Sequence, residues 1–379
     1  MINFNKPYLT GEELNYINDA VICGKLSGNG KYTRLCQTFF ESQYNFKKCL
    51  LTTSCTDALE MAAILFDVQP GDEVIVPSYT FVSTANPFIL RGAKLIFADS
   101  LPNNPNIDVS KLEALITNKT KVIVPVHYAG FACEMDSIMT IANKYKLWVV
   151  EDAAQAIDNY YINTKGKKIA LGSIGHLSAF SFHETKNIIS GEGGMLAVND
   201  ENLIKRAEII WEKGTNRSAF FRGEVDKYNW VDIGSSFLPS EIIASFLWAQ
   251  LQNIRRIQLR RKEIWNLYYN SLYEWAVENS VELPDIPVYS TNNAHMFYLV
   301  CPCIEFRTRL INFLKSQDIM AVFHYVSLHK SQFFESKHDG RVLKESEKYT
   351  DNLLRLPLYF ELKDEDVFKI VSTLKKFKF

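Results

Sequence analysis

Residues 47–65 read KKCLLTTSCTDALEMAAIL, a short apolar run that leads directly into a helical pattern. The run at 49–52 has the length of a buried strand. Ser54 precedes Asp57 by three residues, the spacing of a capping box, so we expect a helix to begin here. Apolar residues then recur at helical intervals, at Ala58, Leu59, Met61, Ala62 and Leu65. The stretch predicts a strand that turns directly into a helix.

The same alternation continues to residue 152. Further apolar runs are separated by helical patterns near 82–91, 109–117 and 136–146; the runs lie at 74–77, 94–99, 122–126 and 148–152. This order predicts an α/β fold with a mostly parallel sheet and helices on both faces. Three short runs then follow without helices between them, at 169–171, 178–182 and 195–198.

The C-terminal part has a different pattern. It is helical from about residue 240 through Trp275, and then we expect a strand at 296–300, a helix at 305–316, a strand at 320–323 and a final helix. We therefore predict a large α/β domain at residues 1–245 and a smaller α+β domain at 246–379. The basic residues Arg255, Arg256, Arg260, Arg261 and Lys262 alternate with apolar ones, which indicates a solvated helix face rather than a nucleic-acid site.

Composition excludes several classes of protein. Lys plus Arg (42) balances Asp plus Glu (43), so no basic surplus favours binding to nucleic acid or to an anionic membrane. We see no signal-peptide pattern and no apolar run long enough to span a membrane, and we expect a cytoplasmic protein. The seven cysteines are scattered and odd in number, which favours reduced thiols over disulfides or a metal site.

Two candidate site features follow predicted strands, where parallel sheets bind their ligands. Ser54-Cys55-Thr56 lies at a strand-to-helix turn, which suits a phosphate, although an ordinary N-cap has the same residues. Asp152 ends another strand, in Glu151-Asp152-Ala153-Ala154-Gln155. A carboxylate there is partly buried and needs a cation, either a protonated pyridine nitrogen or an ordinary Lys or Arg.

A third feature is Lys186, between the run Phe180-Ser181-Phe182 and the turn Gly191-Glu192-Gly193-Gly194. It is well placed to reach a bound carbonyl, although an isolated lysine is usually solvated. Pyridoxal 5'-phosphate requires an anion site, an acid at its ring nitrogen and a lysine for the Schiff base. The chain has all three in suitable places and in suitable order.

The stretches GDEVIVPSYTF (71–81), EDAAQ (151–155) and SFHETKN (181–187) resemble the pyridoxal-phosphate sugar-nucleotide aminotransferases, the DegT/DnrJ family. The resemblance covers essentially the whole chain. It implies fold type I, with a large, mostly parallel, seven-stranded sheet domain and a smaller C-terminal α+β domain. It also implies that the chain is an enzyme that uses pyridoxal phosphate.

Carried over position by position, the resemblance assigns two catalytic residues. Lys186 would form the Schiff base with the cofactor, and Asp152 would pair with its pyridine nitrogen. The other cofactor contacts would be Gln155 at the ring hydroxyl, Phe81 on the ring face, and Cys55, Thr56 and Ser181 at the phosphate, with Ser54 beside them. His324 would lie near the sugar nucleotide. By residue type alone, Phe81 would be a core aromatic and His324 a surface or capping histidine.

Three further segments, at 124–130, 212–218 and 232–236, are similar to family members that aminate TDP-4-keto-6-deoxy-D-glucose. They imply transamination at C4 with L-glutamate, giving TDP-4-amino-4,6-dideoxy-D-galactose and 2-oxoglutarate for surface polysaccharide. Amination at C3, or at C4 from the other face, would use the same motifs. The fold alone also allows a non-catalytic cofactor-binding regulator, although Lys186 argues against one.

The resemblance implies a homodimer whose active sites lie between the subunits. Many family members carry Gly-x-Asn-x-Arg, whose Asn reaches the phosphate in the neighbouring subunit. Here the stretch 234–238 reads GSSFL, so Ser236 replaces that Asn and the Arg is absent. The segment 211–230 is rich in Arg and aromatic residues, a composition typical of interfaces.

Overall fold

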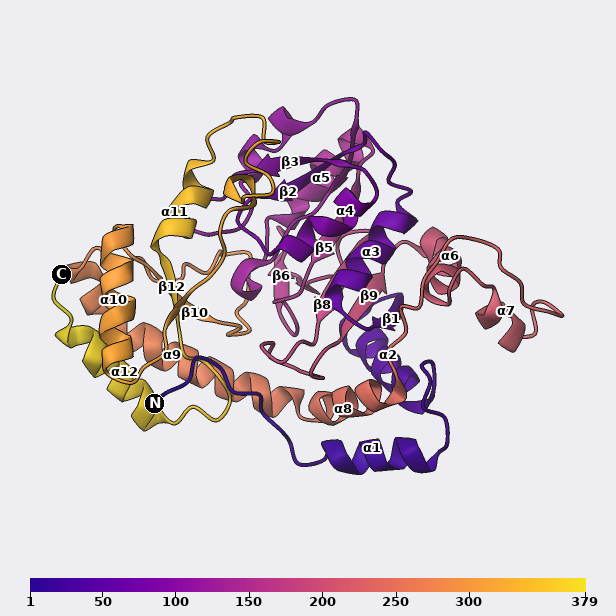
Figure 1. Ribbon diagram of the computed structural model, residues 1–379, viewed down its shortest axis with the longest axis horizontal. Helices are drawn as coiled ribbons and strands as arrows, with labels where there is room; N and C mark the ends of the chain where they lie inside the picture. The colour runs from indigo at the N-terminus through magenta and orange to yellow at the C-terminus, as the bar shows by residue number, and fades with distance from the viewer.

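The computed structural model describes all 379 residues, and a seven-stranded sheet forms its centre (Figure 1). The strand order is β1-β9-β8-β5-β4-β2-β3, and only β9 runs antiparallel to its neighbours. The strands are β1 (Lys48–Thr52), β2 (Glu73–Pro77), β3 (Lys94–Ala98), β4 (Thr120–Ile123), β5 (Trp148–Asp152), β8 (Leu177–Ser181) and β9 (Gly194–Val198). The predicted α/β fold with a mostly parallel sheet is confirmed.

Helices cover both faces of this sheet because its strands are apolar on both sides. In β2, Ile75 packs into one core, whereas Val74 and Val76 pack into another. The first core also receives α2 (Lys31–Tyr44), α5 (Met135–Tyr145) and α8 (Glu241–Gln252), and α1 (Glu13–Ile22) lies against α8. The second receives α3 (Cys55–Leu65), α4 (Asn86–Leu90) and α6 (Glu201–Trp211).

Three predicted elements differ in the structure. Residues 109–115 form two 3-10 turns, η2 (Val109–Lys111) and η3 (Glu113–Leu115), instead of one helix. The helix predicted over 82–91 is divided at Ala85 into η1 (Val82–Thr84) and α4, and Pro87 lies in the first turn of α4, where its missing N–H is tolerated. The run at 169–171 belongs to a separate hairpin of β6 (Tyr160–Ile162) and β7 (Lys168–Ala170).

A second sheet and a third core lie beside the main sheet. The sheet has the order β10-β12-β11 and packs with four helices. These elements are β10 (Phe297–Val300), β11 (Val322–Phe323), β12 (Leu353–Leu356), α9 (Ile254–Glu278), α10 (Ile304–Ser316), α11 (Lys344–Asn352) and α12 (Asp364–Lys376). Helix α9 begins in the first core with Ile254 and Ile257 and continues in the third with Ile264. The division into domains at residues 245 and 246 stays a prediction.

Two expectations about exposed segments need correction. Arg261 on α9 is buried rather than solvated, and its guanidinium donates to the carbonyl oxygens of Ala294 and His295. Trp211 is buried within its own subunit and donates to the Leu51 carbonyl, so it does not belong to an interface. The short helix α7 (Arg217–Phe221) instead extends away from the rest of the molecule (Figure 1). No helix has both the length and the apolarity needed to cross a bilayer.

A buried carboxylate joins α8 to the start of α2. Glu241 is almost fully buried, and its oxygens accept hydrogen bonds from the N–H groups of Gly30 (2.9 Å), Tyr32 (2.7 Å) and Thr33 (3.2 Å). These groups lie at the N-terminal end of α2, which has no side-chain cap of its own. A Cβ at position 30 would lie 2.5 Å from the Glu241 carboxyl carbon, so this approach requires glycine.

We predict that Glu241→Ala lowers the free energy of unfolding by about 3 kcal/mol, because several buried N–H groups lose their acceptor. Denaturant unfolding followed by circular dichroism measures the change. Glu274→Ala is the control, since this side chain is exposed on α9 and makes no hydrogen bond or ion pair, and we expect a change below about 0.5 kcal/mol. Equal effects of the two substitutions would contradict the anchoring role of Glu241.

Candidate active site

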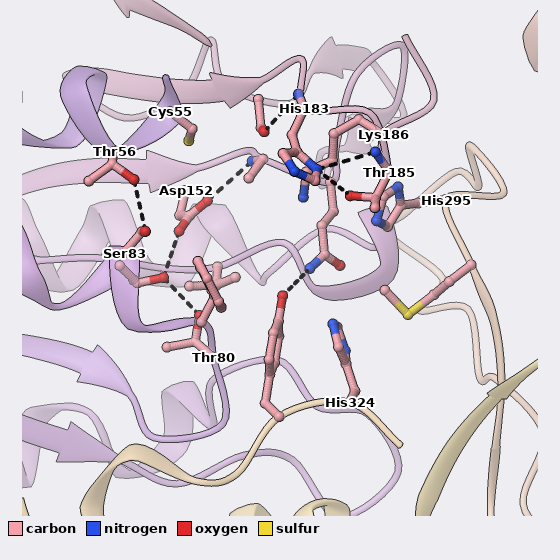
Figure 2. A pocket seen from close by; sticks show the side chains of 18 of the residues that line it. Cys55, Thr56, Thr80, Ser83, Asp152, His183, Thr185, Lys186, His295 and His324 are labelled. Carbon is pink, nitrogen blue, oxygen red and sulfur yellow. Dashed lines mark hydrogen bonds between the residues drawn. The ribbon is translucent and has the colours of Figure 1, made fainter. Parts of the chain in front are cut away.

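A cavity of about 520 Å³ lies where the carboxyl ends of the central strands meet the second sheet. One side is formed by the turn after β1, the ends of β5 and β8, and residues after β2. The other side comes from residues near β10, β11 and β12. Figure 2 shows Thr56, Ser83 and Asp152 on one side of the view, and His183, Lys186 and His295 on the other.

The turn between β1 and α3 forms an anion site in this cavity. Ser54 caps α3 by accepting from Asp57 N–H at 3.0 Å, which confirms the predicted helix start. The N–H groups of Cys55 and Thr56 therefore open the helix without intrahelical acceptors. Gly194 of β9 packs against this turn so closely that a Cβ would lie 2.4 Å from the Cys55 nitrogen.

Hydroxyl groups surround the same turn. Thr56 donates to Ser83 Oγ at 2.8 Å, and Ser181 lines the cavity from the end of β8. Cys55 contributes a neutral thiol, because burial raises its pKa well above the ordinary value. Two free N–H groups, the helix dipole and several hydroxyls suit a phosphate dianion.

Asp152 ends β5 as a buried carboxylate without a cationic partner within ion-pair distance. Its oxygens accept from Thr84 Oγ1 at 2.7 Å and from Ala154 N–H at 3.2 Å. Burial raises the pKa of Asp152, and these two hydrogen bonds and the charge of Lys186 oppose that rise. A carboxylate held in this way favours binding of a cation.

The strand that carries Asp152 is fixed by its neighbour Glu151, which points to the opposite face. Glu151 accepts from the N–H groups of Gly172 and Ile174, both at 2.8 Å, and from His127 Nε2 at 2.9 Å. Cys133 N–H donates to His127 Nδ1, so Nε2 carries the ring hydrogen. This buried network holds β5 rigidly behind the cavity.

Lys186 lies in the loop between β8 and β9, as expected. Asn187 fixes this loop by donating to Gln258 Oε1 and to the Asn293 carbonyl, both at 2.8 Å. The Lys186 ammonium makes no hydrogen bond or ion pair within the chain. Burial lowers the pKa of Lys186, and the Asp152 carboxylate partly opposes that effect. The side chain is therefore a more accessible base than a solvated lysine.

Gln155 bridges the two sides of the cavity. Its Nε2 donates to Tyr325 Oη at 3.1 Å, and its Oε1 accepts from Ala129 N–H at 2.6 Å. Ala129 adopts a positive φ of 57° to present this N–H group. The amide is held in one orientation, with its edge toward the cavity.

Two histidines and an exposed aromatic ring complete the walls. His324 contacts Tyr128 Oη through Nδ1 at 2.7 Å, and burial keeps the pKa of His324 well below its usual value. His295 contacts Asn187 Oδ1 through Nδ1 at 2.8 Å and is also held neutral by burial, which lowers its pKa. The ring of Phe81 is 54% exposed in this monomer, an unusual environment for a core aromatic.

The cavity gathers nine of the ten predicted site residues, namely Ser54, Cys55, Thr56, Phe81, Asp152, Gln155, Ser181, Lys186 and His324. Ser236 does not line the cavity. This residue is exposed, and its backbone forms an isolated antiparallel β-bridge with Glu212. Sequence reasoning missed Thr84, His295, Tyr325 and Arg355. Thr84 and Tyr325 lie next to residues already singled out, the stretch 71–81 and His324, whereas His295 and Arg355 come from segments without such a signal.

Three kinds of group in the cavity are left without partners within the chain. These are a buried carboxylate with no cation, an ammonium with no acceptor, and the free N–H groups that open α3. A cofactor with a basic ring nitrogen, an aldehyde and a phosphate complements all three. The residues present therefore fit this cofactor.

Comparison with known proteins agrees with this geometry. The sequence model of the DegT/DnrJ/EryC1/StrS aminotransferase family matches residues 7–375. The spore coat polysaccharide biosynthesis protein SpsC of Bacillus subtilis is 30% identical, and the alignment covers 98% of this chain and 96% of that protein.

Solved structures show the same fold. The aminotransferase TlmJ of Streptoalloteichus hindustanus superposes with a TM-score of 0.89 at 26% identity, over 99% of this chain and 98% of that one. The PLP form of Spr1654 of Streptococcus pneumoniae, described as a sugar aminotransferase, gives 0.88 at 25% identity over 99% and 97%. Fold type I is confirmed, and the chain belongs to the DegT/DnrJ/EryC1/StrS aminotransferase family.

Proposed function

We propose that this chain is a pyridoxal-phosphate-dependent transaminase that transfers the amino group of L-glutamate to C4 of TDP-4-keto-6-deoxy-D-glucose. The products are TDP-4-amino-4,6-dideoxy-D-galactose, for surface polysaccharide, and 2-oxoglutarate. The observation that supports the chemistry best is the meeting of Lys186, Asp152 and the α3 N-terminus in one cavity. The substrate and the direction of amination rest on the segments at 124–130, 212–218 and 232–236.

Each predicted cofactor contact has its own task in this proposal. Cys55, Thr56 and Ser181 would hold the phosphate, Phe81 would cover the ring face, and Gln155 would contact the ring hydroxyl; all five line the cavity. When bound, pyridoxal phosphate supplies an aldehyde that takes up the amino group and a ring that accepts electrons from the reacting carbon. Asp152 holds a proton on the ring nitrogen through its negative charge.

Lys186 moves the proton of the reacting carbon. Its lowered pKa increases the fraction of neutral amine, so it acts as a general base toward the donor and returns a proton to C4 of the sugar as a general acid. Protonation of C4 by Lys186 from one side would set the galacto configuration. His324, held neutral at the opposite wall, contacts the sugar nucleotide.

Product analysis tests the proposal directly. The purified enzyme is incubated with L-glutamate and TDP-4-keto-6-deoxy-D-glucose, and NMR coupling constants give the position and configuration of the new amine. We expect an axial amine at C4. An amine at C3, or an equatorial amine at C4, would overturn the assignment of the substrate position.

We predict that Lys186→Ala abolishes turnover and leaves the fold intact, because no other cavity side chain is an amine. Turnover is followed by release of 2-oxoglutarate, and thermal unfolding checks the fold. Lys167→Ala, in an exposed loop, is the control and should turn over normally. Near-normal activity of Lys186→Ala would refute its role.

We predict that Asp152→Asn binds the cofactor but reacts about a thousandfold more slowly, a barrier increase of about 4 kcal/mol, because an amide does not stabilise a cationic ring nitrogen. Asp158→Asn is a matched control. Burial raises the pKa of Asp158 too, but it lies outside the cavity. Turnover of Asp152→Asn within a few-fold of wild type would identify Asp152 as a structural carboxylate.

We also propose a two-fold symmetric homodimer in the cytoplasm, in which Ser236 faces the phosphate site of the partner subunit. The segment around α7 supports this, since Phe221 and Trp230 are 67% and 83% exposed in the monomer. We expect sedimentation at twice 43.5 kDa and a weaker cofactor affinity for Ser236→Ala than for Ser235→Ala. A fully active monomer at assay concentration would contradict the dimer.

A further inference from the structure

Arg355 is a cavity residue to which the mechanism above gives no task. It lies on β12, on the side of the cavity opposite the main sheet. Its guanidinium donates one hydrogen bond, from Nη2 to the Phe323 carbonyl at 3.3 Å. The buried Nε makes no hydrogen bond, and Nη1 has no acceptor either. A guanidinium has five N–H donors, so most of those of Arg355 are unused.

No carboxylate of the chain neutralises this charge. Arg355 forms no ion pair, although Asp152 and Glu192 both line the same cavity. The ring of Phe4 covers one face of the guanidinium, with its centroid 4.6 Å from Cζ. A partly buried, unpaired cation of this kind is costly unless a ligand supplies the anion.

Arg261 is a buried arginine of this protein whose guanidinium does have hydrogen-bond acceptors. It is more deeply buried, but two backbone carbonyls accept from its Nε and Nη2, at 3.1 and 2.7 Å. It is not among the residues that line the main cavity. Arg355 differs in having unused donors at the cavity wall.

We propose that Arg355 binds the α-carboxylate of the amino donor through its free N–H groups. This inference rests on the proposed function, because it assumes that an amino acid delivers its amine at Lys186. The planar fork of a guanidinium matches the two oxygens of a carboxylate and binds both at once.

The position of Arg355 favours a carboxylate next to the reacting carbon. The α-carboxylate is one bond from the carbon whose amine is transferred, so its binding group must lie close to Lys186. The positive charge of Arg355 adds to the effect of burial in lowering the pKa of Lys186, which places the two cations in one electrostatic environment.

The diphosphate of a nucleotide sugar is the other oxyanion that enters this site. It must continue into a nucleoside, and so it needs an open path past its binding group. Phe4 covers one face of the guanidinium and Nε is buried, so a ligand has only the remaining N–H edge to bind. A single accessible N–H edge suits the two oxygens of a carboxylate, and we therefore favour the donor carboxylate over the diphosphate.

The test separates the two half-reactions of the holoenzyme. In stopped-flow absorbance without sugar, Arg355→Gln should lower the second-order rate constant for conversion of the bound cofactor by L-glutamate about a hundredfold or more. Arg355→Lys, which keeps the charge but loses the fork, should lower it at least tenfold. The reaction of the pyridoxamine-phosphate enzyme with the nucleotide sugar should change less than threefold.

A second amino-acid substrate shows which carboxylate of glutamate Arg355 binds. L-2-Aminobutyrate keeps the α-carboxylate and lacks the distal one, so Arg355→Gln should slow it by the same factor as glutamate. Binding of glutarate, an unreactive dicarboxylate, gives a readout independent of turnover, and calorimetry should show affinity reduced at least tenfold.

Arg307→Gln is a matched control. Arg307 also has a buried Nε without a partner, donates to one backbone carbonyl and lies over the Phe323 ring, but it does not line the cavity. This variant should resemble wild type in both half-reactions. Thermal unfolding and cofactor absorbance verify that each variant is folded and loaded.

Two results would overturn the inference. If Arg355→Gln slowed only the sugar half-reaction, the residue would bind the diphosphate. If it slowed glutamate but not L-2-aminobutyrate, it would bind the distal carboxylate. Failure of the wild-type enzyme to use glutamate would instead refute the proposed function, so the two failures are distinguishable.

Discussion

A negative charge buried at the end of β5 is the constraint on which the rest of this structure depends. Asp152 has two hydrogen-bond donors and no cation, so the protein must keep its surroundings polar, rigid and ready for a positively charged ligand. Glu151 and His127 fix the strand from behind, and Thr84 orients the carboxylate from the side. The cavity is therefore preorganised before any ligand enters it.

The two sheets carry different groups around the buried Asp152 carboxylate. The main sheet supplies the acid, the anion site and the loop of Lys186, all near carboxyl ends of strands. The second sheet supplies Arg355 on β12 and the adjacent residues His324 and Tyr325, which follow β11. The proposed cofactor contacts thus lie mainly on the first wall, and the opposite wall faces them with side chains that can contact substrates.

Local patterns predicted the main sheet well, because buried strands and caps are encoded over a few residues. β1 ends at Thr52 and Ser54 caps α3, and both features are readable from the sequence 49–57. The two 3-10 turns at 109–115 were missed because amphipathic spacing does not distinguish them from a helix. The burial of Arg261 was missed because its acceptors, at 294 and 295, are distant in sequence. Arg355 was missed for the same reason, since only tertiary structure shows a cation without a counter-charge.

Helix α9 has a consequence for how substrates enter. It is a single helix of 25 residues, and its first turn is packed in one core while its later turns are packed in another. Rotation of one body against the other would bend a continuous row of backbone hydrogen bonds and disturb two interiors at once. The walls of the cavity thus behave as a fixed frame. The two walls that bear the site residues therefore keep their relative positions while substrates enter and leave.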